Sequence, residues 1–397
     1  MNKINDKNND NDDKNNDNDE IIDLESLSTD RYERQKRISW WDQDILKNAK
    51  VLVVGCGTIG NEICKNLALI GVGEIWLVDN DIVEIANLNR SVLMRTEDIG
   101  REKVDAVYDH IKNLNPEIRV VPLNANVVWD IGAGFYRKFD CVFSGLDNRE
   151  ARIYLNKYCY MVGTPFIDSG IEALRGRVMV VNPPDSACYE CTFSERDYML
   201  LSIKYSCPGL PVEDLIEGKV PMVATTSSVI AGIQVQEAVK IMHNKKSPLE
   251  GKELYFDGNT CEISIHGIQK RDDCMGHFYI ENIILVPITI KNTLKELREE
   301  IKNKINTDDF VVVHDRELTY RAICKNCNIK KDILKLIGRL TEKEAYCKCG
   351  ERFNFETTSE LKNDEMTLEE HHVPMNHILT VQTGNEVYYV ELSGEEK

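Results

Sequence analysis

The sequence predicts a Rossmann-like α/β fold, with a doubly wound and mainly parallel sheet, followed by a smaller α+β domain. The first observation is an apolar run, Val51–Val54, that leads into the glycine turn Gly55-x-Gly57-x-x-Gly60. The second is a helical apolar pattern after the turn and another apolar run, 75–78, that ends at Asp79. The third is that strands and helices keep alternating up to about residue 147. This alternation predicts helices on both faces of the sheet and a ligand at the carboxyl ends of its strands.

The individual elements follow from apolar runs and from helical spacing. In the first domain we expect strands at 51–54, 75–78, 118–122 and 140–143, helices at 60–70 and 102–113, and a short helix around 41–48. Residues 162–167 and 177–181 are expected to extend the sheet. Residues 218–243 are expected to form a long buried helix after a loop.

The character of the chain changes near residue 280, where we place a domain boundary. Strand-like runs follow at 283–290 and 310–313, and 378–381 with 387–392 is typical of a final hairpin. Residues 293–305 show an amphipathic helical pattern that opens with the capping box Thr293-x-x-Glu296. We therefore divide the chain into a tail (1–27), a nucleotide-binding domain (28–279) and a C-terminal α+β module (280–397).

Composition predicts a globular protein that carries a separate polar tail. Residues 1–27 are rich in Asn and Asp and are expected to be disordered. The net charge is −17, and still −10 without residues 1–30, which argues against nucleic acid as the main partner. There is no run of about 20 apolar residues and no signal-peptide pattern, so we expect a cytoplasmic protein without a membrane span. Thirteen cysteines in that compartment are more typical of metal ligands or reactive thiols than of disulfides.

The glycine turn predicts nucleotide binding, because glycines let the backbone approach a phosphate at a helix N-terminus. Asp79, 19 residues beyond Gly60, is where a carboxylate meets a ribose hydroxyl. Taken alone, this pattern is shared by dehydrogenases and methyltransferases. The polar residues that follow favour a triphosphate and Mg²⁺ over a dinucleotide: Asn87, Arg90, Lys103 and, after a strand, Asp147. A G-x-x-x-x-G-K-[ST] sequence is absent, which excludes a P-loop ATPase.

Six motifs in this order resemble the ubiquitin-activating enzyme superfamily, over a span from Arg31 to about His277. That group includes molybdopterin-synthase and thiamine-pathway adenylyltransferases and the activating enzymes for ubiquitin-like proteins. Two positions depart from its usual pattern, since Thr58 replaces a glycine and Ser91 replaces a glutamine. The motifs are RYERQ at 31–35, GCGTIG at 55–60, LVDND at 77–81, NLNR at 87–90, GREK at 100–103 and GLDN at 145–148.

The resemblance implies roles for individual residues. Asp79 is implied as the ribose ligand, Asn87, Arg90 and Lys103 as phosphate ligands, and Asp147 as the Mg²⁺ ligand. Arg34 matches the family's arginine finger, which reaches into a neighbouring subunit and so implies a homodimer. The implied reaction is attack of a substrate's C-terminal carboxylate on the α-phosphorus of ATP, giving an acyl-adenylate and pyrophosphate. That carboxylate is already ionised near neutral pH, so no catalytic base is needed.

Two cysteine clusters have the spacing of zinc sites. Cys188-x-x-Cys191 and Cys274-x-x-His277 match the paired knuckles that the family uses for a structural zinc, with a histidine in place of the last cysteine. Cys324-x-x-Cys327 and Cys347-x-Cys349 suggest a zinc ribbon in an insert at 320–353, outside the shared core. The alternative is that these are unrelated thiols.

Cys207 lies in a predicted crossover loop at about 192–220, where activating enzymes carry their thioester-forming cysteine. A thiolate on such a loop is suited to take the acyl group from AMP. The alternative is a loop cysteine without a role. Cys56, Cys64, Cys141, Cys159 and Cys261 are expected in buried settings. His371, His372 and His377 are expected in a solvated segment.

The sequence therefore predicts ATP-dependent adenylation of the C-terminal Gly-Gly of a ubiquitin-like protein, followed by thioester transfer to Cys207 and hand-over to a conjugating enzyme. The nearest rival is a sulfur-carrier adenylyltransferase that stops at the acyl-adenylate. A tRNA-modifying dehydratase, a non-catalytic nucleotide-binding scaffold and an NAD-dependent dehydrogenase are further alternatives. The expected cofactors are ATP, Mg²⁺ and Zn²⁺.

Overall fold

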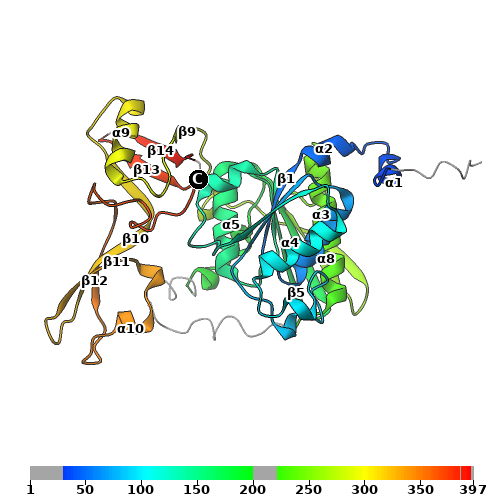
Figure 1. The fold of residues 1–397 in the computed structure, drawn as a ribbon, viewed down its shortest axis with the longest axis horizontal. Coiled ribbons are helices and arrows are strands. Elements are labelled where there is room, and N and C mark those ends of the chain that lie inside the picture. The colour runs from blue at the N-terminus through cyan, green and yellow to red at the C-terminus, as the bar shows by residue number, and fades with distance from the viewer. Residues whose placement is uncertain (1–29, 200–220, 385, 395–397) are drawn as a thin grey trace, which may run out of the picture.

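The computed structural model describes residues 30–199, 221–384 and 386–394. The first domain is built on an eight-stranded sheet in the order β3-β2-β1-β4-β5-β6-β7-β8 (Figure 1). The pairs from β3 to β5 are parallel and the pairs from β5 to β8 are antiparallel. The strands are β1 (Lys50–Val54), β2 (Glu74–Asp79), β3 (Arg119–Asn124), β4 (Cys141–Ser144), β5 (Phe166–Glu172), β6 (Arg175–Val181), β7 (Lys252–Asp257) and β8 (Glu262–Gly267).

Helices cover both faces of this sheet, as the alternating pattern predicted. One face carries α3 (Thr58–Ile70), α4 (Lys103–Leu114) and α8 (Ala224–Met242), with the short α2 (Gln43–Asn48) beside α8. The other face carries α5 (Arg149–Val162) and the 3-10 helix η3 (Ala133–Lys138). Figure 1 shows the two helical layers on opposite sides of the strands.

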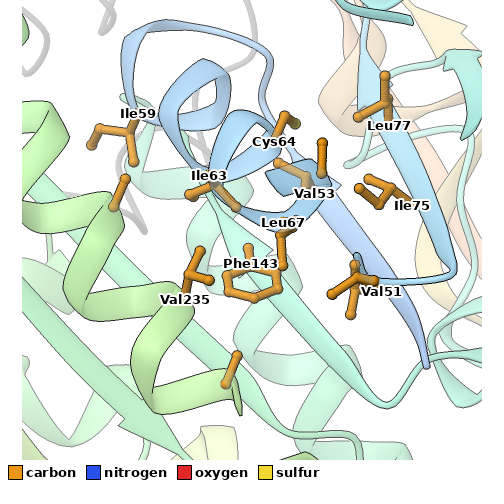
Figure 2. Packing of buried hydrophobic residues seen from close by; sticks show 14 of the residues in the cluster. Val51, Val53, Ile59, Ile63, Cys64, Leu67, Ile75, Leu77, Phe143 and Val235 are labelled. Carbon is orange, nitrogen blue, oxygen red and sulfur yellow. The ribbon is translucent and has the colours of Figure 1, made fainter. Parts of the chain in front are cut away.

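The alternation of side chains along β1 divides the core between these faces. Val51 and Val53 pack with α3, α8 and Phe143 (Figure 2). Leu52 and Val54 pack on the α5 side. All four side chains are at most 1% exposed. Burial of each contributes about 1.5–3 kcal/mol, so β1 is anchored from both sides. This rigid strand ends at the glycine turn.

Several elements differ from the sequence prediction. Residues 162–167 are not one strand, because Val162 ends α5 and Gly163 (φ +77°) turns the chain before β5. The strand expected at 283–290 stops at Val286, since Pro287 cannot donate to a ladder. Helix α5 and the hairpin β7–β8 were not predicted. The apolar pattern of the helix is interrupted by the buried polar residues Arg152 and Asn156, and β8 is exposed along its whole length.

The C-terminal module is a second, mixed sheet in the order β11-β10-β13-β14-β9, with β12 paired to β10. Its helix α9 (Leu294–Ile305) begins with the expected capping box, in which Thr293 and Glu296 bond each other's backbone N–H groups. The strands are β9 (Ile283–Val286), β10 (Val311–Ile323), β11 (Lys330–Leu336), β12 (Asn354–Glu360), β13 (Ile378–Gln382) and β14 (Val387–Leu392).

Strand β10 is much longer than expected and connects two parts of the module. Its first three residues pair with β13, and residues 318–323 pair with both β11 and β12. The β10–β11–β12 part forms an arm that ends in the second cysteine cluster, and Figure 1 shows it extending from the module beside the first domain. The base of this arm meets the first domain where Gly338 lies against Trp129.

Candidate functional site

The glycine turn is built from backbone contacts that exclude a side chain. Gly55 has a φ of +89°, in the left-handed region that favours glycine. A Cβ atom on Gly60 would lie 1.8 Å from the Gly55 carbonyl oxygen, and one on Gly145 would lie 2.8 Å from the same atom. Gly57 differs, because a Cβ atom there would meet nothing within 4 Å. The turn therefore packs tightly against its own helix and the β4 loop while Gly57 faces open space.

Asp79 is held beside this turn at the carboxyl end of β2. Its carboxylate accepts hydrogen bonds from the backbone N–H of Cys56 at 2.6 Å and of Asp81 at 2.8 Å. Burial raises the pKa of Asp79 above its ordinary value, although Lys103 and both N–H groups oppose the rise. The side chain is thus fixed where the sequence predicted a ribose ligand.

Lys103 and Asp147 join Asp79 at this edge of the sheet. Lys103 begins α4, is 9% exposed, and donates from Nζ to Asp81 Oδ2 at 2.8 Å. Burial opposes its charge, but the carboxylates of Asp79, Asp81 and Asp147 raise the pKa of Lys103 above its ordinary value. Asp147 is exposed in the loop after β4. Asp81 was missed as a site residue, although it ends the LVDND motif.

Arg90 and Asn87 lie in the segment between β2 and α4. Arg90 donates from Nη1 to the Ala86 carbonyl and to Asn89 Oδ1, and its buried Nε has no hydrogen-bond partner among the described residues. Asn87 accepts from the backbone N–H of Glu84 and so closes its own 3-10 turn, η1 (Ile85–Asn87). The unpaired guanidinium N–H of Arg90 is suited to an anionic oxygen.

Arg34 does not reach the glycine turn of its own chain. It is exposed in α1 (Glu33–Lys36), where the neighbouring Gln35 donates to the Ile70 carbonyl at the end of α3. The glycine turn lies at the other end of α3, and a helix of 13 residues spans about 20 Å. Within one chain Arg34 is therefore remote from Asp79 and Lys103.

The first cysteine cluster is assembled as predicted. The ligand atoms of Cys188, Cys191, Cys274 and His277 lie within 4.8 Å of one another. Cys188 and Cys274 have their Sγ atoms 3.6 Å apart, close to the spacing of about 3.8 Å in a tetrahedral Zn²⁺ site. The hydrogen bond from Cys188 lowers the pKa of Cys274, which favours the thiolate that zinc requires. His277 also stacks on Tyr160, which fixes its ring.

The second cluster closes the tip of the β10–β11–β12 arm. The Sγ atoms of Cys324 and Cys349 are 3.6 Å apart, and Cys327 and Cys347 complete the set within 4.8 Å. The backbone N–H of Cys327 donates to Cys324 Sγ at 3.4 Å, as suits a thiolate in a knuckle. The donor chemistry of both clusters fits a structural zinc ion.

The remaining thiols and histidines correct some expectations. Cys207 lies outside the described residues. Cys56, Cys64, Cys141 and Cys159 are buried, but Cys261 is exposed because it sits in the β7–β8 turn.

His371 and His377 are each 1% exposed, so a solvated segment was wrong for them. His371 bonds the Lys362 carbonyl, and His377 lies 3.2 Å from the Asp315 carboxylate. His314, Asp315 and His377 form a third group of metal-ligand type. Lys157 Nζ and Arg316 Nε lie 3.1 and 3.7 Å from the Asp315 oxygens, so the group already holds cations of its own.

Comparison with known proteins shows where this arrangement belongs. The model of the ThiF family matches residues 32–276, which contain the glycine turn, Asp79, Lys103, Asp147 and the three cysteines of the first cluster, and His277 lies one residue beyond the match. The chain belongs to the ThiF family. The match stops before the C-terminal module, so neither that module nor its second cysteine cluster is part of the ThiF domain.

Relatives of this ThiF-family protein cover the same span. The SAMP-activating enzyme E1 of Haloferax volcanii is 30% identical over 64% of this chain and 90% of its own length. The molybdopterin-synthase adenylyltransferase of Salmonella typhimurium is also 30% identical, over 64% of this chain and 97% of its own. The crystal structure of Escherichia coli MccB with ATP superposes with a TM-score of 0.53 at 27% identity, covering 64% of this chain and 75% of MccB.

None of the helices in the described part of the chain has both the length and the apolar character needed to cross a membrane.

Proposed function

We propose that this protein uses ATP and Mg²⁺ to adenylate the C-terminal glycine of a ubiquitin-like or sulfur-carrier protein. The observation that carries this proposal is the set of Asp79, Lys103 and Asp147 beside a glycine turn that excludes side chains. The names of the relatives, a SAMP-activating enzyme and a molybdopterin-synthase adenylyltransferase, support the same chemistry. A dehydrogenase has no need of a buried lysine at this position.

Each residue would have a distinct task in adenylation. Asp79, already fixed by two N–H groups, would accept from the ribose hydroxyls of ATP. Lys103, Asn87 and the unpaired Nε of Arg90 would bind phosphate oxygens, where negative charge develops during the transfer. Asp147, exposed near Lys103, offers the carboxylate that Mg²⁺ prefers alongside phosphate oxygens. When bound, Mg²⁺ would neutralise phosphate charge.

The proposed reaction requires no catalytic base. The attacking group is a carboxylate, which is ionised near neutral pH. Adenylation then depends on holding this carboxylate in line with the α-phosphorus and on neutralising charge. The buried ammonium of Lys103 is suited to that task, because a neighbouring triad of carboxylates keeps it protonated.

We also propose a homodimer in which Arg34 acts on the partner subunit's nucleotide. Arg34 is exposed and about 20 Å from its own glycine turn, so a second chain is the direct way to bring it to a phosphate. Transfer of the acyl group to Cys207 and hand-over to a conjugating enzyme are the further steps we propose. The rival without a thioester, a sulfur-carrier adenylyltransferase, predicts that Cys207→Ala leaves the products unchanged.

The decisive experiment is ATP–pyrophosphate exchange with proteins that end in Gly-Gly. Lys103→Met is expected to reduce exchange by about 100-fold or more, because it removes a charge aimed at the phosphates. Lys50→Met is the matched control, since Lys50 lies at the opposite end of β1 and pairs with Glu74. If the protein binds ATP but none of the Gly-Gly-ended proteins supports exchange, the proposal is refuted.

A non-reducing gel of the same reactions tests the thioester. A reductant-sensitive adduct that Cys207→Ala abolishes supports transfer to this thiol. Normal ATP–pyrophosphate exchange without any reductant-sensitive adduct on the gel supports the alternative, a sulfur-carrier adenylyltransferase.

A further inference from the structure

A buried arginine links the Asp147 loop to the rest of the ThiF domain. Arg152 lies in the first turn and a half of α5 and is 8% exposed. Its guanidinium donates from Nε to the Leu146 carbonyl at 3.1 Å and from Nη2 to the same oxygen. Leu146 directly precedes Asp147, so this contact fixes the peptide group from which Asp147 extends.

Arg152 is held in turn by a buried carboxylate on β5. Its Nε lies 3.7 Å from Asp168 Oδ1, and Asp168 is fully buried. Arg177 donates to the other oxygen of Asp168 at 3.0 Å and to Glu253 at 2.6 Å. The series Glu253–Arg177–Asp168–Arg152 therefore runs from β7 across β6 and β5 to the Leu146 carbonyl.

This placement is unfavourable for an arginine unless the contact itself is needed. A cation near a helix N-terminus opposes the helix dipole. A guanidinium removed from water also loses hydration that only close partners replace. The contacts of Arg152 with Asp168 and with the Leu146 carbonyl offset both unfavourable effects. On the other side of Asp147, Asn148 caps α5 by accepting from the N–H groups of Glu150 and Ala151.

We propose that Arg152 is a positioning residue for the Mg²⁺ ligand, fixing the Leu146 carbonyl so that the exposed Asp147 carboxylate has one orientation, with Asp168 fixing Arg152. Both residues that flank Asp147 are held by these contacts and are only partly exposed, whereas Asp147 itself is exposed. The inference rests on the proposed role of Asp147 toward Mg²⁺. It adds two residues that the motifs of the family resemblance did not single out.

The test is the gain in ATP affinity that added Mg²⁺ produces, measured by calorimetry beside AMP binding without metal. Arg152→Gln and Arg152→Lys are both expected to reduce this gain by about 10- to 100-fold, toward the value of Asp147→Asn. AMP affinity is expected to change by much less, because no hydrogen bond or ion pair joins Arg152 to Asp79 or to the glycine turn in the described part of the chain. In an Asp147→Asn background, Arg152→Lys should have no further effect.

Arg149→Gln is the matched control, an exposed arginine one turn away that pairs with Asp197. An unchanged Mg²⁺ gain in Arg152→Lys, or a parallel loss of AMP affinity, would overturn the proposal. If Arg152→Gln does not fold, Arg152→Lys decides, since it keeps a positive charge beside Asp168. A wild-type protein that binds ATP with a Mg²⁺ gain but performs no exchange would refute the adenylation function and leave this inference standing.

Discussion

At the scale of single residues, the glycines of the turn are needed for two different reasons, packing of the fold and space for a ligand, which the sequence motif does not distinguish. Gly60 is needed because its hydrogen faces the Gly55 carbonyl oxygen, where a Cβ atom would lie 1.8 Å away. Gly57 has open space at the same position, so no packing contact explains it. The fold thus demands Gly60, and the open space beside Gly57 leaves the ligand as the reason for that glycine.

Alanine at these two positions should separate folding from nucleotide binding. Gly60→Ala is expected to destabilise the domain by about 1–3 kcal/mol or more, because the backbone must shift to admit the methyl group. Gly57→Ala is expected to cost no more than about 1 kcal/mol and yet to weaken ATP binding, since the methyl group enters the space for the phosphates. Melting temperature and ATP affinity measure the two effects. Equal melting temperatures for both variants would contradict this assignment.

The sequence could predict only those site residues that a local pattern of residue types and spacing identifies. Asp79 and Lys103 occupy the predicted positions because each is set by a local element, the end of β2 and the start of α4. Arg152 and Asp168 could not be found in this way, since their contact joins α5 to β5 and no local pattern records it. The burial of His377 depends likewise on a partner, Asp315, that is 62 residues away.

At the scale of elements, the capping box of α9 is a local sequence signal that the structure confirms. Thr293→Ala should lower stability by about 1 kcal/mol, because the N–H of Glu296 loses its acceptor. Calorimetry of the full chain measures this loss, expected in the unfolding of the C-terminal module. Thr260→Ala is the control, as Thr260 is exposed and bonds only Glu262. If Thr260→Ala lost a similar amount of stability, the loss in Thr293→Ala could not be attributed to the helix cap.

The elements that sequence patterns missed lack such signals. Helix α5 buries the polar residues Arg152 and Asn156 among its apolar ones, so its buried face does not form a simple apolar stripe. Strand β8 is exposed throughout, so its alternation corresponds to no buried face. The long β10 joins two parts of one sheet, and a short apolar run such as 310–313 cannot show which strand pairs with which part of β10.

The two cysteine clusters predict two zinc ions per chain, one in each domain. Elemental analysis should show one ion after Cys349→Ser and one after Cys274→Ser. Cys349→Ser is expected to leave ATP binding unchanged, since its cluster lies at the tip of the arm and outside the ThiF match. Cys261→Ser, which changes an exposed thiol in neither cluster, should keep both ions. One ion or none in the wild type would contradict the assignment of both sites.

At the scale of the whole molecule, the two domains are joined by a cluster of polar side chains as well as by apolar contact. Asp315 of β10 accepts from the Tyr158 hydroxyl at 2.9 Å and from Lys157 at 3.1 Å, both on α5. Arg316 donates to the same Tyr158 hydroxyl, and its guanidinium lies over the Trp129 ring. Ile378 of β13 packs into the core on the α5 side of the sheet. The module therefore rests on the helix that carries Asn148 and Arg152.

This junction predicts a loss of stability in mild acid. Burial lowers the pKa of His377 below its ordinary value of 6.5, although Asp315 opposes the change. The unfolded chain then binds a proton more readily than the folded one between that lowered pKa and 6.5, so stability falls as pH decreases through this range. The pKa of Asp315 is also lowered, since its cations outweigh burial, but that contribution is lost only when pH falls below about 4.

His377→Gln should isolate the effect, because glutamine does not titrate. Between about pH 7.5 and pH 5.5 the wild type is expected to lose more unfolding free energy than the variant, by up to about 1.4 kcal/mol for each unit of lowered pKa. Scanning calorimetry at several pH values measures the difference, and His266→Gln, which changes an exposed histidine, should follow the wild type. Parallel pH dependence in wild type and His377→Gln would mean that His377 takes up a proton without cost and that other groups, such as the half-buried His372, set the acid sensitivity of the junction.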